Sequence, residues 1–371
     1  MKSKHIQERS QLLSLLLLVA LCAQASAQTA SAQTAHKPSD EVRREAASLA
    51  GTVLVGGRSM DYLRGLADGF GGRLSGSPAY ERSAEWAAQQ FRAAGVKDVR
   101  LEEWSLDNTW QRGTEAHGRI TAPVERRLNV ESLGWSPSTP SGGVRGEVIL
   151  VSDITPEGIR SQAARIKGRV VMLDIRRLFA QNVWKAFQLA IASQPLFKEA
   201  GAVALIFPES TANNAHSALS LNWGSTLAPL PEAEFGMEDG KLIKRLLQEQ
   251  PARPVTVEFN YENRTAARTV THNVVAEIRG RERPDEWVIV GAHLDSWDFG
   301  TGAQDNGAGV AQVLEAARAI ASMPRPPRRS IRFALWGGEE QGLLGSAAYA
   351  RAHESEMKTC IAALNTDNGA G

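Results

Sequence analysis

The stretch Glu286-Trp-Val-Ile-Val-Gly-Ala-His-Leu-Asp295 decides the fold and the site of this 371-residue chain. Its apolar run is typical of a buried strand, and His293 stands where that strand is expected to end. A glycine-rich loop follows, after which apolar residues recur at helical spacing from Asn306 to about Ser322. Asn306 is the expected N-cap of this helix, and Asp305 directly precedes it.

The alternation of predicted strands and helices continues after this helix. Ser330–Trp336 is a second apolar run, and it is followed by Glu339 and Glu340. A helical stretch then leads to a third run, Cys360–Asn365, which predicts a buried strand and is followed by Asp367. The order strand, helix, strand, helix, strand indicates a parallel sheet. Each polar candidate therefore lies at or beyond the carboxyl end of a predicted strand, where open α/β sheets place their sites.

The residue types in this pattern favour metal-assisted hydrolysis. His293 and Asp295 are two positions apart, so on an extended chain they point to the same side and the carboxylate can orient the imidazole. Glu339 and Glu340 are adjacent and point in different directions, so one can bind metal while the other accepts a proton. Imidazole and carboxylate groups are common ligands of Zn²⁺. Singly, each acid is more often a cap or a solvated residue; their joint placement favours a site.

These residues resemble the co-catalytic zinc exopeptidases of clan MH. The resemblance implies an α/β three-layer sandwich with a mixed, largely parallel sheet, two Zn²⁺ ions in a complete site, and hydrolysis of dipeptides or short peptides by metal-activated water. It assigns the roles as follows: His293 and Asp367 bind one zinc ion, Glu340 binds the other, Asp305 bridges both, and Glu339 is the general base. Asp295 joins Glu339 as a catalytic residue, because it orients His293.

One departure from the family pattern affects the expected activity. The resemblance implies a further histidine on the second zinc ion, whereas the last histidine of the sequence is His353, on the helix predicted between the second and third strands. We therefore expect that the chain is truncated at its C-terminal end. We also expect that this chain alone holds at most one zinc ion well and hydrolyses peptides poorly.

Other functions were weighed against this one. An aminopeptidase on the same scaffold is the nearest alternative, and a catalytically inactive, receptor-like or truncated homologue is the alternative from another class. A dinucleotide-binding loop at Gly300-Thr-Gly302 is disfavoured, because the third glycine of that fingerprint is missing and Asp305 would repel phosphate.

The N-terminal end predicts export. Met1–Ala27 has a basic start, an apolar run and a small-residue cleavage site, as in a secretory signal. The apolar run is too short to span a bilayer, so we expect a secreted or periplasmic protein with no membrane span after cleavage. With a formal net charge of +1, the protein lacks the excess of basic residues that is typical of nucleic-acid-binding proteins. The expected partner is a small peptide substrate, and a homodimer is an open option.

The sequence predicts a peptidase fold that is interrupted once, by an inserted domain. After the signal, residues 28–120 form its N-terminal part, with a helix starting at Ser77-Pro78 and ending near Ala94. Residues 121–265 resemble the β-rich protease-associated insert of the family, and residues 266–371 form the incomplete peptidase core. His216 in the insert is expected at the surface, and His272 is expected to be structural.

Overall fold

A computed structural model describes residues 38–368, except residues 114, 209–210, 218–219 and 223. The predicted export signal, Met1–Ala27, lies outside the described residues. The chain divides into two compact units, Met1–Gly51 and Thr52–Gly371, and helix α2 (Asp40–Gly56) contains the boundary. Both sheets belong to the second unit. Among the described residues, no helix combines the length and the apolar content needed to cross a membrane.

A five-stranded mixed sheet in the second unit has the strand order β1-β10-β12-β11-β13. Its strands are β1 (Asp98–Arg112), β10 (Asn263–Ile278), β11 (Arg283–His293), β12 (Arg329–Trp336) and β13 (Cys360–Asn365). β11 runs parallel to both β12 and β13, as the strand–helix–strand pattern predicts. β10 pairs antiparallel with both β1 and β12. Within this five-stranded sheet, only β11, β12 and β13 pair in parallel, and these are the strands that precede the candidate residues.

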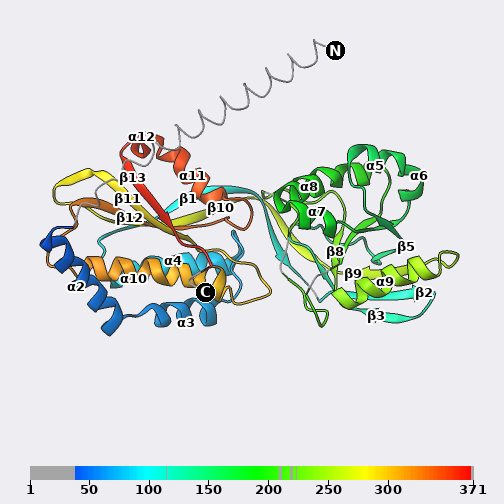
Figure 1. The fold of residues 1–371 in the computed structure, drawn as a ribbon, viewed down its shortest axis with the longest axis horizontal. Coiled ribbons are helices and arrows are strands. Elements are labelled where there is room, and N and C mark those ends of the chain that lie inside the picture. The colour runs from blue at the N-terminus through cyan, green and yellow to red at the C-terminus, as the bar shows by residue number, and fades with distance from the viewer. Residues whose placement is uncertain (1–37, 114, 209–210, 218–219, 223, 369–371) are drawn as a thin grey trace, which may run out of the picture. The chain divides into compact units, whose positions relative to one another are not determined.

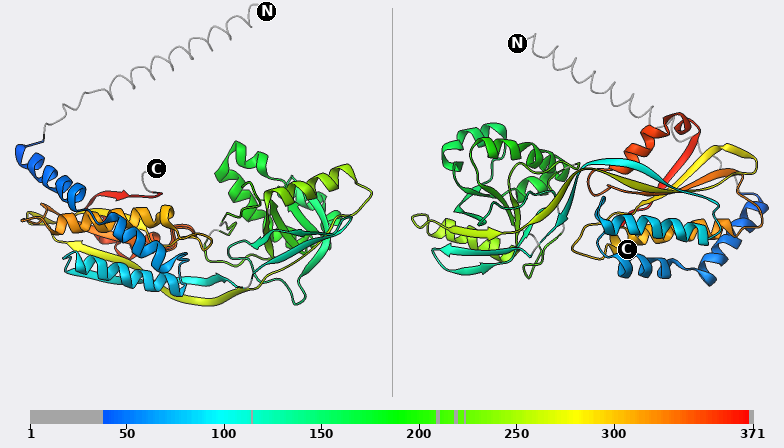
Figure 2. Two further views of the ribbon diagram at one scale, coloured as in Figure 1. Left: turned by 90° about the horizontal axis from the view of Figure 1, so that it is seen from below. Right: turned by 180° about the vertical axis from the view of Figure 1, so that it is seen from behind.

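Helices cover both faces of this sheet (Figures 1 and 2). On one face α4 (Pro78–Ala93) packs on β1 and β10, and α10 (Ala308–Ala321) packs on β11 and β12, with α3 (Ser59–Phe70) against α10. On the other face α11 (Leu344–Ala352) contacts β1 and β10 and is followed by α12 (Glu354–Met357). This is the three-layer α/β/α sandwich that was expected.

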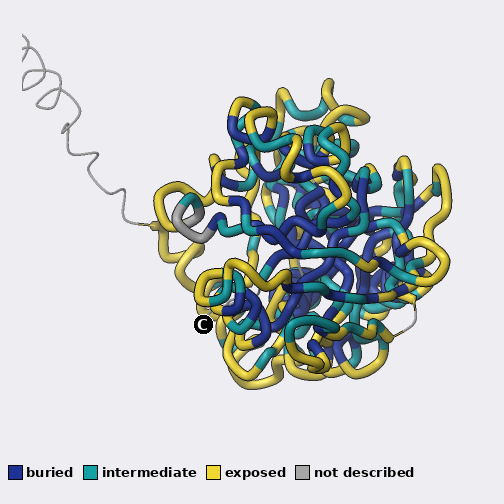
Figure 3. The backbone as a smooth tube through the Cα atoms, turned by 90° about the vertical axis from the view of Figure 1, so that its right-hand side faces the viewer, coloured by how far each residue is buried: buried dark blue, intermediate teal, exposed yellow. Residues whose placement is uncertain are grey.

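Helix α4 shows how local sequence signals and burial act together. The Ser77 hydroxyl accepts a hydrogen bond from the backbone N–H of Tyr80 at 3.1 Å, and Pro78 occupies the first turn. Small residues on its buried face allow close approach to the sheet, and Phe91 packs on Phe333 with ring centroids 6.2 Å apart. In Figure 3 the buried parts of the backbone, in dark blue, lie in the interior, and the exposed parts, in yellow, lie mostly at the outside. The predicted start of this helix is confirmed, and its end lies within one residue of Ala94.

An eight-stranded sheet lies between β1 and β10 in the sequence, in the order β3-β2-β9-β5-β6-β7-β8-β4. Its strands are β2 (His117–Ala122), β3 (Arg126–Leu128), β4 (Val130–Ser132), β5 (Val144–Val151), β6 (Val170–Leu173), β7 (Ala204–Pro208), β8 (Glu232–Phe235) and β9 (Thr256–Asn260). Its helices are α5 (Pro156–Ser161), α6 (Ala163–Ile166), α7 (Arg176–Gln181), α8 (Val183–Glu199) and α9 (Met237–Glu249). The antiparallel pair β1 and β10 carries the chain into this segment and back. Its identity as a protease-associated domain stays a prediction.

Two expectations about burial are wrong. The strand β13 was expected to be buried, but Ile361 and Leu364 are 52% and 61% exposed, and Cys360 is half-buried. The reason is its place at the edge of the sheet, where β11 is its only strand partner among the described residues. His216 was expected at the surface, but only 10% of its side chain is exposed, because it lies 3.4 Å from the buried carboxylate of Glu234.

The buried carboxyl group of Glu232 on β8 gives a stability prediction. Burial raises the pKa of Glu232 to about 8, and a hydrogen bond from Asn222 at 3.4 Å only partly opposes this rise. The folded state therefore binds this proton more tightly than the unfolded state, so the stability of the fold falls as the pH rises from about 4.5 to about 8. Glu232→Gln removes the effect and is expected to stabilise the protein at pH 7 by roughly 2 to 3 kcal/mol.

Urea unfolding of wild type and Glu232→Gln at pH 5 and pH 8 checks this prediction. The difference in unfolding free energy between the two proteins should be larger at pH 8. Glu249→Gln, at an exposed position at the end of α9, is the control and should change little at either pH. An equal difference at the two pH values would contradict the prediction.

Candidate metal centre

Three side chains from separate parts of the sequence meet at the carboxyl edge of the parallel strands. His293 ends β11, Asp305 lies in the π-helical turn η1 (Ala303–Gly307), and Asp367 follows β13. His293 Nε2 is 3.0 Å from Asp305 Oδ1 and 3.2 Å from Asp367 Oδ1. One ligand atom from each residue lies within 4.8 Å of the other two. The expected convergence of these residues is therefore observed, while their role as ligands stays a prediction.

The register of the sheet explains why these residues meet. β11 and β13 are parallel neighbours, with Gly291 opposite Asn365, and the backbone N–H of Thr366 donates to the carbonyl of Gly291 at 2.9 Å. The chain beyond each strand consequently emerges at the same edge of the sheet. The side-chain amide of Asn306 also donates a hydrogen bond to the carbonyl of Thr366 at 2.8 Å, which holds the segment after β13 beside the turn that carries Asp305.

Asn306 also begins helix α10, as the sequence predicted for an N-cap. Its side-chain oxygen accepts a hydrogen bond from the backbone N–H of Gly309 at 3.0 Å, although the regular helix begins at Ala308. The same side chain thus caps the helix and holds the segment before Asp367. Asp305 therefore lies directly before the residue that hydrogen-bonds to the first turn of α10.

The site concentrates negative charge around one buried imidazole. His293 is only 1% exposed, whereas the side chains of Asp305 and Asp367 are 50% and 43% exposed. Burial lowers the pKa of His293, but hydrogen bonds to Asp295 and Asp305, together with the negative charges of Asp295 and Glu339, outweigh it and raise that pKa to about 11. The surrounding carboxylates therefore strongly favour a cation at this position.

Asp295 has a different contact from the one expected. The imidazole Nδ1 of His293 is 3.0 Å from the main-chain carbonyl of Asp295 and 3.6 Å from its carboxylate. The carboxylate instead accepts the backbone N–H groups of Glu339 at 3.2 Å and Glu340 at 3.3 Å. The main-chain carbonyl is therefore the nearer acceptor for the imidazole, leaving Nε2 directed toward Asp305 and Asp367. The fully buried Asp295 links the end of β11 to the segment after β12.

Glu339 and Glu340 follow β12 and lie near the cluster without belonging to it. Burial raises the pKa of Glu340 to about 8, and the negative charges of Asp295 and Asp305 add to the rise. Burial also raises the pKa of Glu339, with His293 opposing that change. Among the described residues, the group of converging ligand atoms contains neither glutamate. Their division into ligand and base thus stays a prediction.

The other histidines considered in the sequence lie elsewhere. The two ring nitrogens of His353 are 2.9 Å from a Glu102 oxygen and 3.1 Å from a Glu356 oxygen, and its ring stacks on Tyr349 with centroids 4.3 Å apart. His272 Nδ1 is 2.8 Å from Glu81. Both residues are held in ion-pair contacts away from the cluster, as expected for structural histidines.

Sequence reasoning missed the loop before α4 as part of the site. No role was predicted for the loop Gly72–Gly76, but Arg73 and Ser75 in this loop are fully buried. The Ser75 hydroxyl accepts the backbone N–H of Gly338 at 2.6 Å, directly before Glu339. An arginine and a serine between glycines were the available signal, but their partners lie more than 200 positions away in the sequence.

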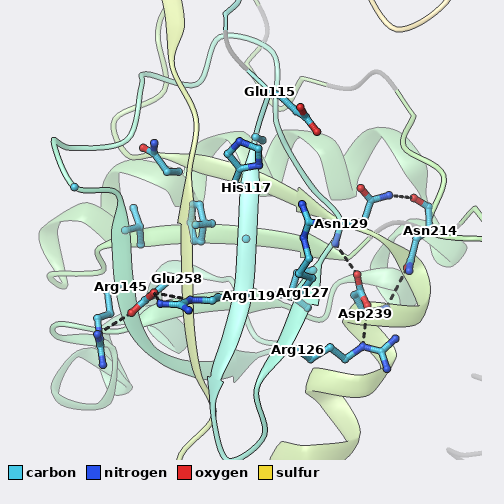
Figure 4. Close-up of a pocket in the computed structure, with 17 residues that line it drawn as sticks. Glu115, His117, Arg119, Arg126, Arg127, Asn129, Arg145, Asn214, Asp239 and Glu258 are labelled. Carbon is cyan, nitrogen blue, oxygen red and sulfur yellow. Dashed lines mark hydrogen bonds and ion pairs between the residues drawn. The ribbon is translucent and has the colours of Figure 1, made fainter.

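A groove of about 790 Å³ on the eight-stranded sheet contains none of the candidate metal-site residues (Figure 4). Its charged groups pair with one another across the strands: Glu258 is 2.8 Å from Arg119 and 2.7 Å from Arg145. The groove is therefore separate from the candidate metal centre.

Comparison with known proteins agrees with this geometry. Residues 273–370 match the model of peptidase family M28, a segment that contains all six candidate site residues. This part of the chain is therefore similar to M28 peptidases.

The similarity to known proteins extends beyond that segment. The chain is 28% identical over 316 residues to carboxypeptidase Q of Mus musculus, covering 84% of this chain and 65% of the relative. It is 30% identical over 303 residues to the probable lipoprotein aminopeptidase LpqL of Mycobacterium tuberculosis, covering 80% of this chain and 55% of the relative. The crystal structure of a peptidase M28 precursor from Shewanella amazonensis SB2B matches with a TM-score of 0.75 and 29% identity, over 90% of this chain and 76% of that one. The chain thus spans 65% of the length of carboxypeptidase Q.

Proposed function

We propose that the protein is a zinc-dependent exopeptidase, similar to carboxypeptidase Q, that hydrolyses dipeptides or short peptides. The convergence of His293, Asp305 and Asp367 is the observation that carries this proposal. It is supported by the match of residues 273–370 to peptidase family M28. Secretion or export to the periplasm and a protease-associated insert that walls the substrate cleft are further parts of the proposal.

The donor set fits a zinc ion. Ligand atoms about 2 Å from one tetrahedral ion lie roughly 3 to 3.5 Å from one another. The separations of 3.0 Å and 3.2 Å between His293 Nε2 and the two aspartates agree with this requirement. In a complete two-zinc site, His293 and Asp367 would hold one ion, Glu340 would hold the other, and Asp305 would bridge them. Bound zinc supplies a water of lowered pKa and polarises the carbonyl of the scissile bond.

The protein residues would supply positioning and proton transfer. Glu339 would accept a proton from the attacking water and pass it to the nitrogen of the leaving amine. Burial raises the pKa of Glu339, which helps its carboxyl group to hold that proton between the two steps. Asp295 would keep the imidazole of His293 in place and fix the backbone on which both glutamates stand.

An aminopeptidase is the second candidate, because a relative with 30% identity bears that name. The two activities differ in the end of the peptide that must be free. We expect cleavage of dipeptides with a free carboxylate and little cleavage of amino-acid anilides, which carry only a free amine.

Zinc content and hydrolysis of these two substrate types, measured before and after treatment with a chelator, test the proposal. Chelation should abolish hydrolysis, and added Zn²⁺ should restore it. Faster cleavage of the anilides would favour the aminopeptidase. In a protein that carries the complete two-zinc site, zinc binding without cleavage of either substrate would indicate a catalytically inactive homologue. Hydrolysis that persists in the verified zinc-free protein would contradict the metal assignment.

A further inference from the structure

Arg73 is a fully buried arginine whose guanidinium group, within the described part of the chain, donates its hydrogen bonds to backbone carbonyl groups. Its Nε donates to the carbonyl of Leu294 at 2.9 Å, and its Nη2 donates to that of Gly302 at 3.0 Å. Its Nη1 donates to the carbonyls of Gly71 and Thr301, both at 2.8 Å. Four of the five N–H donors of the guanidinium group are thereby used, in a forked arrangement that a lysine ammonium cannot reproduce.

Three of these four acceptors, the carbonyls of Leu294, Thr301 and Gly302, lie at the two ends of one segment, residues 294–302. Leu294 directly follows His293, and Thr301 and Gly302 precede the turn that carries Asp305. The backbone of Arg73 adds two contacts in the middle of the segment, because its N–H donates to the Ser296 hydroxyl and its carbonyl accepts the N–H of Ser296, both at 3.1 Å. One residue therefore fixes the start, the middle and the end of the chain between two candidate ligands.

The segment is packed closely around the guanidinium group. Gly302 has a φ of +58°, and a Cβ atom there would lie 2.9 Å from Arg73 Nη2 and 2.3 Å from the Ser296 hydroxyl. Only glycine fits this backbone conformation and this contact. Burial lowers the pKa of Arg73 to about 10, and the negative charge of Asp295 opposes that change, so the guanidinium group remains positively charged at neutral pH. Arg73 thus restricts the backbone conformation of residues 294–302 and also places a positive charge beside them.

We propose that Arg73 is a positioning residue of the metal centre, which holds residues 294–302 so that His293 and Asp305 face one another. The inference rests on the proposed function, because it requires that these two residues bind a metal ion. Residues of this kind, which orient the ligands of a metal, typically change metal affinity by about 10- to 100-fold when they are replaced.

The test compares Arg73→Lys with Arg332→Lys in the same protein. Arg332 is also buried, on β12, and binds Tyr349, Glu356 and Glu277, none of which is a candidate ligand. Affinity for Co²⁺ and Zn²⁺ is measured by titration, the visible absorption of bound Co²⁺ reports the ligand geometry, and thermal unfolding without metal reports stability. We expect metal affinity about 10- to 100-fold lower and an altered Co²⁺ spectrum for Arg73→Lys only. Both variants should lose thermal stability.

The outcomes separate the inference from the proposed function. A wild-type protein that binds neither ion would overturn the proposed function and the inference with it. Wild-type affinity and spectrum in Arg73→Lys, or equal losses in both variants, would overturn the inference alone. If Arg73→Lys does not fold, Ser296→Ala takes its place: it removes one contact to Arg73 and should weaken metal binding about two- to tenfold. Unchanged affinity in that variant would likewise overturn the inference.

Discussion

In a protein that carries the complete two-zinc site, Glu339→Gln is expected to retain bound zinc and to hydrolyse peptides about 10²- to 10⁴-fold more slowly than the wild type. The amide preserves the shape of the side chain, but it cannot accept the proton of the attacking water. The contact that places this residue, from its backbone N–H to Asp295, is unaffected by the substitution. Zinc content by elemental analysis and turnover of a dipeptide substrate check the two halves of the prediction separately.

Glu340→Gln and Glu354→Gln are the matched controls for this variant. Glu340→Gln should lower zinc content, because an amide is a poorer zinc ligand than a carboxylate. Glu354, exposed at the start of α12, should tolerate the same change without effect on zinc or turnover. Equal loss of zinc from the Glu339 and Glu340 variants would show that ligand and base are wrongly divided between them.

The sequence predicted the parallel part of the fold because each of its elements has a strong local signal. The apolar runs at β11, β12 and β13 are bounded by polar residues, and Asn306 and Ser77 act as helix caps where their positions indicated. The carboxyl ends of parallel strands share one edge, so the meeting of His293 with Asp367 followed from the order of elements.

Contacts that depend on distant parts of the chain were not predictable in this way. The contacts of the Asp295 carboxylate and of Arg73 join residues about 44 and more than 200 positions apart, respectively. Nothing local in the sequence specifies such partners, because they are brought together only when the layers pack. The exposure of β13 has the same origin, since it depends on the place of the strand at the sheet edge and not on its own composition.

His293→Ala is expected to lower zinc affinity by about 100-fold or more and to reduce peptide hydrolysis below detection. A structural zinc site with four ligands contributes about 10 to 16 kcal/mol of binding free energy, so the loss of one ligand removes roughly a quarter of it. The effect should be large here, because His293 is buried and its Nε2 lies within 3.2 Å of both aspartates. Titration with Zn²⁺ against a competing chelator measures the affinity.

His353→Ala distinguishes the loss of a ligand from the loss of another histidine that is held between carboxylates. His353 also contacts two carboxylates, Glu102 and Glu356, and it stacks on Tyr349, so its removal should cost stability as well. Its partners lie on β1, α11 and α12, and none of these elements carries a candidate ligand. Thermal unfolding temperature should therefore fall in His353→Ala while zinc affinity stays at the wild-type value. Loss of zinc from His353→Ala, with zinc retained by His293→Ala, would contradict the assignment of the metal centre to the ends of β11 and β13.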